Sequence, residues 1–316
     1  MRTKTLLLVA LSLICYLPSQ SQKIIDGFFN EQGSLSLTAG YTNTHYDSFY
    51  VGTMKVDQVP VGDVDQDIFS LYGKFAITDD FTVITSVPYI SEEAGGNPDP
   101  INGESKLSDF QDIQIALKYR LHRFQIDDNN TFVVLAAAGV TIPGGYEPNG
   151  IISLGTGSFN ENFSLGAQYN NASGFFISAI TGYSFRGKAD DNFDILVSRD
   201  EFNVPNALLF NGRVGYAGSH FYLEAFADVQ SSVNGVDIMG PGFGNNFPET
   251  EVDYTVVGLS AYVPLGSSFG VSGAYGTTTS GRNIGDTDYF NVGLTYNLGG
   301  GGGSSSASSP SNSSSN

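Results

Sequence analysis

Residues 289–298 alternate strictly: the even positions are apolar or aromatic, and the odd positions from Asn291 to Asn297 are small or polar. Successive side chains of a β-strand point to opposite faces, so this pattern predicts a strand with one apolar and one polar face. Comparable alternation recurs along the chain between turn residues. No convincing helical period appears beyond the first twenty or so residues. The chain therefore folds as an all-β protein.

The alternation predicts twelve strands, and the connections between them differ in length. Those after the even-numbered strands are short, at residues 79–80, 122–130, 170–174, 217–220 and 266–268, whereas most of the others are long. Outer-membrane barrels have even strand counts, short periplasmic turns and longer outside loops. The predicted strands are residues 34–44, 67–78, 81–89, 110–121, 131–142, 162–169, 175–185, 207–216, 221–230, 252–265, 269–277 and 289–298.

The start of the chain has the pattern of an export signal. Arg2 and Lys4 precede an apolar run at residues 6–17, and a short segment of small and polar residues follows. This pattern is typical of a secretory signal peptide, here residues 1–22, and the run is too short to span a membrane as a helix. Cys15, the one cysteine, lies inside it. The mature chain is then expected to have no thiol for a disulfide or a metal.

A soluble β-sandwich also has alternating strands. It does not require long loops at one end, nor aromatic residues at the ends of the apolar faces, as at Tyr41, Phe69, Tyr119 and Phe269. Aromatic girdles of this kind lie at headgroup depth in membrane barrels. We therefore predict a transmembrane antiparallel up-and-down β-barrel over residues 23–298, located in the outer membrane of a Gram-negative bacterium. Its expected partners are outer-membrane lipid and the barrel-assembly machinery.

The charge of the chain excludes one class of partner. Without Arg2 and Lys4, 12 basic residues face 32 acidic ones, and 12 − 32 gives a net charge of −20. Such a polyanion does not attract nucleic acid. Residues 299–316 are rich in glycine and serine and cannot bury apolar surface, so they are expected to form a disordered periplasmic tail.

The residues that most often carry chemistry give weak signals. The three histidines, His45, His122 and His220, are expected in a loop and in two turns, where they cannot form one metal site. Two aspartate groups, at residues 63, 65 and 67 and at residues 190, 191 and 194, lack the pattern of an EF-hand and are interpreted as a solvated rim. Ser48 and Ser219 lie near a histidine, but neither is in a nucleophile motif. We expect no catalytic residue, metal or cofactor.

The inward faces of the predicted strands are the better candidate site. By parity they receive charged residues of both signs with tyrosines beside them. These groups either pair across the lumen and make the barrel rigid, or line a polar path for a solute. The candidate lumen-lining residues are Lys74, Asp112, Lys118, Arg120, Arg213, Glu224, Asp228, Tyr222 and Tyr254. Lys118 and Arg120 are expected to pair with Glu224 and Asp228 or to attract solute.

Three segments resemble one family of outer-membrane barrels. Residues 112–121, DIQIALKYRL, resemble the GD-x-x-x-x-x-KYRL strand of the family named for the MetA pathway of phenol degradation. Residues 139–145, GVTIPGG, are similar to its G-x-x-x-P-x-G strand end, and residues 154–158, LGTGS, to the LGTGS that follows. In this sequence Gln111 stands where the family has a glycine.

The resemblance implies a channel or transporter for a small, hydrophobic or aromatic molecule, and it supplies no binding residues. We therefore expect passive passage of a small solute without catalysis. One alternative is a barrel closed by its own side chains that has a structural or surface-interaction role. Another is an outer-membrane lipid hydrolase.

Overall fold

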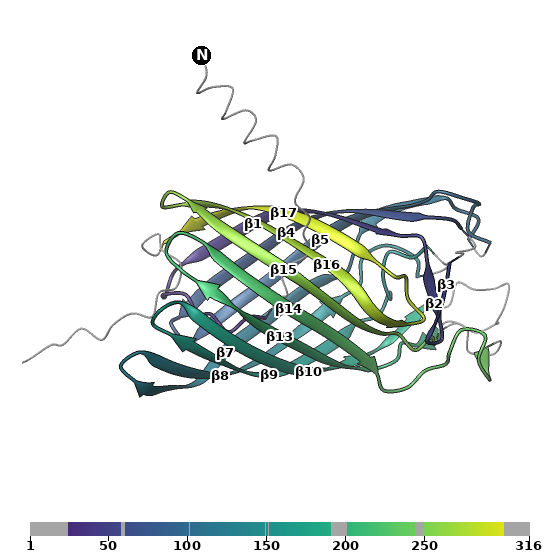
Figure 1. The fold of residues 1–316 in the computed structure, drawn as a ribbon. Helices are drawn as coiled ribbons and strands as arrows, with labels where there is room; N and C mark the ends of the chain where they lie inside the picture. Colours follow the sequence, from purple (N-terminus) through teal and green to yellow (C-terminus); the bar gives the residue numbers. More distant parts are fainter. Residues whose placement is uncertain are drawn as a thin grey trace, which may run out of the picture.

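The computed structural model describes residues 25–57, 61–100, 102–148, 150, 152–190, 201–243 and 249–299. The predicted signal peptide lies outside this range, and so do Asp191, Asp194 and residues 300–316 of the predicted tail. Within the described ranges, no helix has the length and apolar character needed to span a membrane. The described chain consists of long tilted strands around a common axis (Figure 1).

The strands follow the predicted order. Twelve long stretches correspond to the twelve predicted strands, with β6 and β7 together in place of the fourth. The strands are β1 (Leu35–Tyr46), β2 (Phe49–Val51), β3 (Met54–Val56), β4 (Val64–Thr78), β5 (Phe81–Ala94), β6 (Lys106–Phe110), β7 (Ile113–Asp127), β8 (Asn130–Ile142), β9 (Asn160–Asn171), β10 (Phe175–Arg186), β11 (Lys188–Asp190), β12 (Glu201–Asn203), β13 (Ala207–Ala217), β14 (Tyr222–Ser232), β15 (Asp253–Leu265), β16 (Phe269–Arg282) and β17 (Asp288–Leu298).

Hydrogen bonding closes the wall into a cylinder. The last strand, β17, pairs antiparallel with β1 from Leu35↔Leu298 to His45↔Asp288, and β4 pairs with both β1 and β5. The sheet has 13 strands, but β6 and β7 pair with successive parts of β5, so they form one wall strand and the barrel has twelve. Closure leaves no free sheet edge along the wall, as a β-structure in lipid requires. The predicted fold class is confirmed.

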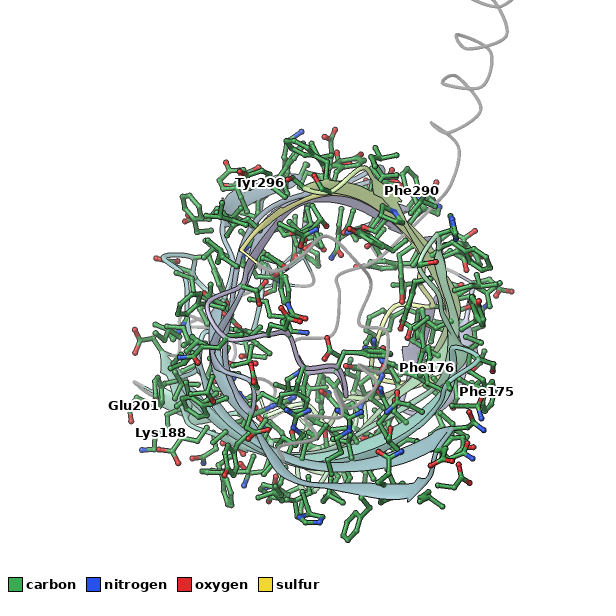
Figure 2. The ribbon with its side chains drawn as sticks, turned by 90° about the vertical axis from the view of Figure 1, so that its left-hand side faces the viewer. Phe175, Phe176, Lys188, Glu201, Phe290 and Tyr296 are labelled. Carbon is green, nitrogen blue, oxygen red and sulfur yellow. The ribbon has the colours of Figure 1, made fainter. Side chains whose placement is uncertain are left out.

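Side chains alternate between the two surfaces of the wall. Phe176 points into the barrel and is 1% exposed, whereas its neighbour Phe175 points outward and is 43% exposed (Figure 2). The outward positions hold most of the exposed large apolar residues, such as Leu165, Leu259 and Leu294. The buried polar residues of the wall strands lie on the inner face instead. This is the inverse of a soluble protein and matches an exterior in contact with lipid.

The two ends of the barrel differ. The turn end holds the short turns after β4, β7, β9, β13 and β15, and the loop end holds the long loops, including the hairpins β2–β3 and β11–β12. At the loop end, side chains from the ends of β1, β4 and β5 and from two loops pack into a small apolar core of Tyr46, Val61, Val64, Ala94 and Ile152. The predicted separation of short and long connections is correct.

Several details of the prediction are wrong. The fourth strand is interrupted at residues 111–112, because β6 and β7 pair separately with β5 on either side of Pro88. The expected turn at residues 122–130 is instead a two-residue turn, because β7 continues to Asp127 and β8 begins at Asn130. The alternation of apolar and polar residues breaks after Leu121. A register shift between Arg120 and His122 accommodates this break, and the pairing of β7 with β8 continues beyond it. His122 therefore lies in β7, and His45 lies in β1.

Candidate functional site

The strand register places eight of the nine candidate lumen residues on the inner face of the wall. Arg213 shares the face of Phe176, because Phe176 pairs with Gly215, and the same parity holds for the other strands. The eight are Lys74 on β4, Lys118 and Arg120 on β7, Arg213 on β13, Tyr222, Glu224 and Asp228 on β14, and Tyr254 on β15. Asp112 lies in the break between β6 and β7.

The chain before β1 lies inside the barrel. Residues 25–32, which we call the strap, cross the bore near the turn end (Figure 2). The strap joins the wall at Gly33, whose φ of +82° lets the chain turn and whose N–H donates to the carbonyl of Ala76 at 2.8 Å. The backbone N–H of Gln32 donates to Asp79 Oδ1 in the turn after β4, at 2.7 Å. The bore is therefore partly occupied at this end.

Asp26 of the strap forms ion pairs with two lysines of the wall. Lys118 Nζ lies 2.6 Å from Asp26 Oδ1, and Lys74 Nζ lies 2.9 Å from Asp26 Oδ2. Lys118 is 0% exposed and also donates to the carbonyl of Phe28 at 2.5 Å. A buried ammonium needs such partners, because desolvation of an unpaired charge is costly. The strap supplies the only carboxylate that these two lysines contact within the described chain.

Aromatic contacts hold the rest of the strap. The ring of Phe28 packs edge-on against Phe176 and Tyr222, with centroids 5.0 and 6.0 Å apart. The ring of Phe29 lies 4.4 Å from Lys118 Nζ and 4.9 Å from Arg120 Cζ, which are cation–π distances. These contacts join the strap to β7, β10 and β14, on different sides of the bore.

A second ionised cluster lies on β13, β14 and β15. Arg213 Nη1 is 3.2 Å from Glu224 Oε1, and Glu224 also accepts hydrogen bonds from the hydroxyl groups of Tyr222 and Ser260. Asp228 accepts a hydrogen bond from Asn211 Nδ2. The charged groups of this cluster are held by neighbours on the same side of the wall.

The expected pairing of Lys118 and Arg120 with Glu224 and Asp228 is wrong. Lys118 pairs with Asp26 of the strap, and Arg120 Nε lies 2.6 Å from Asp80 Oδ1 in the turn after β4. Asp112 accepts a hydrogen bond from the hydroxyl of Tyr146, in the loop after β8. The reason is distance. Lys118 and Arg120 find carboxylates nearer than Glu224 and Asp228, on the strap and in the turn after β4, so no contact with the opposite wall is needed.

The strap is the element of the candidate site that sequence reasoning missed. Its residues contain no alternation and precede the first strand, so they gave no strand signal. One signal was available: a carboxylate and two phenylalanines, Asp26, Phe28 and Phe29, lie between the predicted signal peptide and the first predicted strand. The sequence does not show where this segment lies, because its contacts are with strands far along the chain.

The other candidate groups do not assemble into a site. His45 Nδ1 contacts Asp65 Oδ1 at 2.8 Å on the exposed rim, and Asp67 accepts hydrogen bonds from Tyr41 and Asn43. Across the described residues, no group of three or more His, Cys, Asp or Glu side chains could hold a metal ion. Ser219 Oγ lies 3.0 Å from His220 Nδ1 in an exposed turn, and Ser48 is buried in a loop. A contact between adjacent exposed residues does not position a nucleophile.

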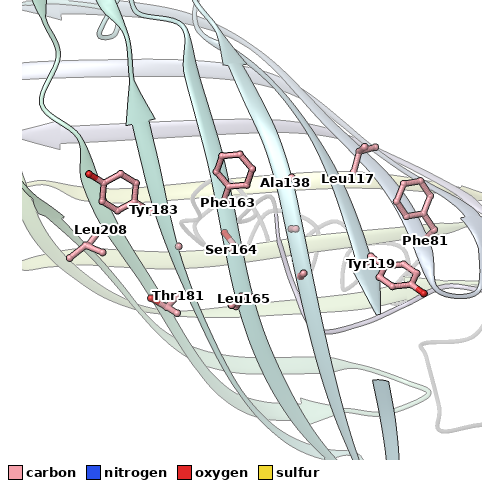
Figure 3. Close-up of a pocket in the computed structure, with 13 residues that line it drawn as sticks. Phe81, Leu117, Tyr119, Ala138, Phe163, Ser164, Leu165, Thr181, Tyr183 and Leu208 are labelled. Atoms are coloured by element: carbon pink, nitrogen blue, oxygen red, sulfur yellow. The ribbon is translucent and has the colours of Figure 1, made fainter. Parts of the chain in front are cut away.

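A surface groove lies on the outside of the wall. It has a volume of about 670 Å³ and runs over β7, β8, β9 and β10 (Figure 3). Small residues on β8, Ala136 and Ala138, lie between larger side chains on the neighbouring strands, including Leu117, Phe163 and Leu165. The groove belongs to the apolar exterior and is separated from the bore by an unbroken β-ladder.

A closed twelve-stranded antiparallel barrel with an apolar exterior and an ionised interior has the architecture of the outer-membrane barrels. The chain belongs to the family described as "Putative MetA-pathway of phenol degradation", whose profile matches residues 63–257, more than half of the chain. This confirms the resemblance that the three motifs indicated. Among curated proteins, none matches the sequence.

One solved structure shows the same fold, and a second is more distant. The COG4313 outer membrane channel from Pseudomonas putida F1 superposes with a TM-score of 0.68 at 14% identity, over 87% of this chain and 100% of that chain. The translocator domain of the autotransporter NalP from Neisseria meningitidis has a TM-score of 0.46 at 12% identity, over 84% of this chain and 89% of that one. The first similarity establishes the fold, and the second is too distant to support an argument.

Proposed function

We propose that the protein is a passive channel for small molecules in the outer membrane of a Gram-negative bacterium, with its turn end facing the periplasm and no catalytic activity. The observation that carries the proposal is the bore itself: a closed wall with ionised side chains inside and a strap, separate from the wall ladder, across one end. The similar Pseudomonas putida protein is an outer membrane channel, which supports this assignment. Outer-membrane lipid and the barrel-assembly machinery are the proposed partners.

The strap is suited to act as a movable part. Among the described residues, the strap contacts the wall from Ile25 to Asn30 through its side chains or through lysine ammonium donors of the wall, whereas hydrogen bonding between strap and wall backbones starts only at Gly33. An element held by a few ion pairs and ring contacts can leave without breaking the β-ladder. The candidate lumen residues are proposed to line the pathway once it has left.

A planar-bilayer experiment tests this proposal. In Asp26→Asn, Lys74 and Lys118 lose their carboxylate while the wall is unchanged. Because removal of one partner of a buried ion pair costs about 3 kcal/mol, we expect the strap to dissociate roughly a hundredfold more often. Single-channel recordings in KCl are then expected to show longer and more frequent openings than the wild type.

Lys106→Met is the matched control, because Lys106 pairs with Glu93 on the exposed surface of the loop end. It is expected to behave as the wild type. Bilayers that stay silent with the wild type, with Asp26→Asn and with Lys118→Ala would overturn the channel proposal.

Such silence would favour the alternative, a barrel plugged for a structural or surface-interaction role. One observation supports that alternative: Lys118, Ile84 and Leu135 are 0% exposed on the inner face, so part of the bore is tightly packed. Conductance and its dependence on Asp26 distinguish the two functions.

A further inference from the structure

The strap presents a carboxylate followed by an aromatic ring to a site with two matching parts. Asp26 lies between Lys74 and Lys118, and the ring of Phe28 packs against Phe176 and Tyr222. The Phe28 N–H donates to Asp26 Oδ1 at 2.9 Å, so the two groups form one folded unit. A carboxylate beside an aromatic ring is also the combination of groups that a small aromatic acid carries.

The charges of the wall require an anion at this position. Nearby cations have acceptors of their own, since Arg120 pairs with Asp80 and Arg213 pairs with Glu224. Lys74 and Lys118 pair only with Asp26 among the described residues. If the strap left and a neutral solute took its place, two ammonium groups would face that solute unpaired. A carboxylate restores their partner, so an acid displaces the strap at a lower cost than a neutral molecule does.

The aromatic part of the site belongs to the wall. Phe176 and Tyr222 stack on each other, with centroids 5.5 Å apart and planes inclined by 21°. Both are anchored on neighbouring parts of the wall, and Tyr222 is further held by its hydroxyl bond to Glu224. A flat ring entering from the bore therefore meets a prebuilt edge-to-face platform.

The strap does not satisfy every polar group of the site. Gln168 Oε1 and Ser178 Oγ are buried without a hydrogen-bond partner, and the two residues are paired across β9 and β10. Gln168 packs directly against Gly27, which offers it no side chain. Because buried polar atoms are normally hydrogen-bonded, these two atoms indicate that the strap is an incomplete occupant.

We propose that this site binds small aromatic monocarboxylates and that the strap occupies it as an internal competitor. Such an acid pairs its carboxylate with Lys74 and Lys118, places its ring against Phe176 and Tyr222, and displaces Asp26 and Phe28. The inference names the solute class of the proposed channel and rests on that function for its physiological meaning.

A fluorescent strap tests the proposal. The sequence contains no tryptophan, so Phe28→Trp in the refolded full chain is a single reporter of strap position. Benzoate, phenylacetate and 3-phenylpropionate are titrated against benzyl alcohol, which lacks the charge, and cyclohexylacetate, which lacks the aromatic ring. We expect the aromatic acids to increase acrylamide quenching at concentrations at least about tenfold lower than either control, because only they supply both the anion and the ring.

Two further variants keep the test decisive. Direct calorimetric titration of Asp26→Asn/Phe28→Ala, which empties the site, is expected to show tighter binding of phenylacetate than the wild type shows. Adding Lys74→Met is expected to abolish that binding, whereas adding Lys106→Met leaves it unchanged. Heat-modifiable gel migration verifies that each barrel is folded.

Equal responses to acids and benzyl alcohol, or binding that survives the loss of Lys74, would overturn the proposed site. KCl conductance measured on the same preparations separates this result from failure of the channel. Conductance without acid binding contradicts the site alone, and acid binding without conductance contradicts the channel alone.

Discussion

At the residue scale, the strap depends on the absence of a side chain at one position. A Cβ added to Gly27 would lie 2.1 Å from Gln168 Oε1 and 2.5 Å from Gln168 Cδ. Gln168 is 1% exposed, so it has little room to move aside. Glycine at this position is therefore a packing requirement of the docked strap.

Gly27→Ala is expected to weaken docking without changing any charge. Forcing an extra methyl group into a packed site costs typically about 1–3 kcal/mol, which corresponds to a rise in the undocked fraction of roughly fivefold to a hundredfold. Tryptophan quenching in the Phe28→Trp background measures this fraction. Gln168→Ala removes Oε1 and Cδ but keeps the Cβ, which would lie 2.7 Å from the added methyl group, so it is expected to restore docking only in part in the double variant. If Gly27→Ala quenches as its parent does, the close contact has no energetic role.

At the element scale, a polar cluster at the loop end connects two of the loops to the wall. Arg282, the last residue of β16, donates from Nε and Nη2 to Asp237 at 2.7 and 2.8 Å, and its Nη1 lies 2.9 Å from Glu251. Asn283, with a φ of 52°, donates to Asp237 and accepts from the N–H groups of Gly52 and Ile238. The cluster joins the β2–β3 hairpin, the loop between β14 and β15, and β16.

This cluster predicts an acid threshold for the loop between β14 and β15. The hydrogen bonds and charge of Arg282 lower the pKa of Asp237 to about 2, although burial opposes them. Because the folded-state pKa is depressed, the stabilisation is complete above the ordinary aspartate value of about 3.9 and is lost as the pH falls towards the folded value. Burial raises the pKa of Glu251. As the pH falls, the carboxylate of Glu251 is therefore protonated before that of Asp237, and the ion pair between Asp237 and Arg282 is the last to be lost.

Pepsin, which is active in acid, provides the measurement. Cleavage within residues 233–252 is expected to stay slow down to about pH 4 and to accelerate progressively as the pH falls towards about 2, the folded-state pKa of Asp237. Asp237→Asn is expected to be cleaved readily over the whole range. A wild-type loop whose cleavage rate does not change with pH would show that Asp237 does not hold it.

At the scale of the whole molecule, the barrel exists only when the two ends of the wall meet. The β1–β17 seam combines its backbone ladder with polar contacts on the inner face: Thr38 Oγ1 lies 2.8 Å from Thr295 Oγ1, and Ser36 Oγ lies 2.6 Å from Asn297 Oδ1. Asn291 Nδ2 donates to Thr42 Oγ1 at 3.0 Å. These contacts join residues that lie 249 to 261 positions apart in the sequence.

Two truncations follow from this seam. Deletion of residues 288–316 removes β17, leaves the edges of β1 and β16 unpaired in lipid, and is expected to abolish the heat-modifiable folded band. Deletion of residues 304–316 removes only predicted tail and is expected to preserve that band. A folded band without β17, or its loss in the shorter deletion, would contradict this division of the chain.

The sequence by itself determined the architecture, because lipid and water impose a period of two on every wall strand, and alternation can be read locally. It also placed Lys74, Lys118, Arg213 and Glu224 on the inner face, since parity alone decides that side. It did not determine the path of the strap or the partner of each lumen cation. Only the closed barrel brings Asp26 within reach of β4 and β7 and Phe28 within reach of β10 and β14, because these contacts join segments far apart in the chain and leave no periodic trace in it.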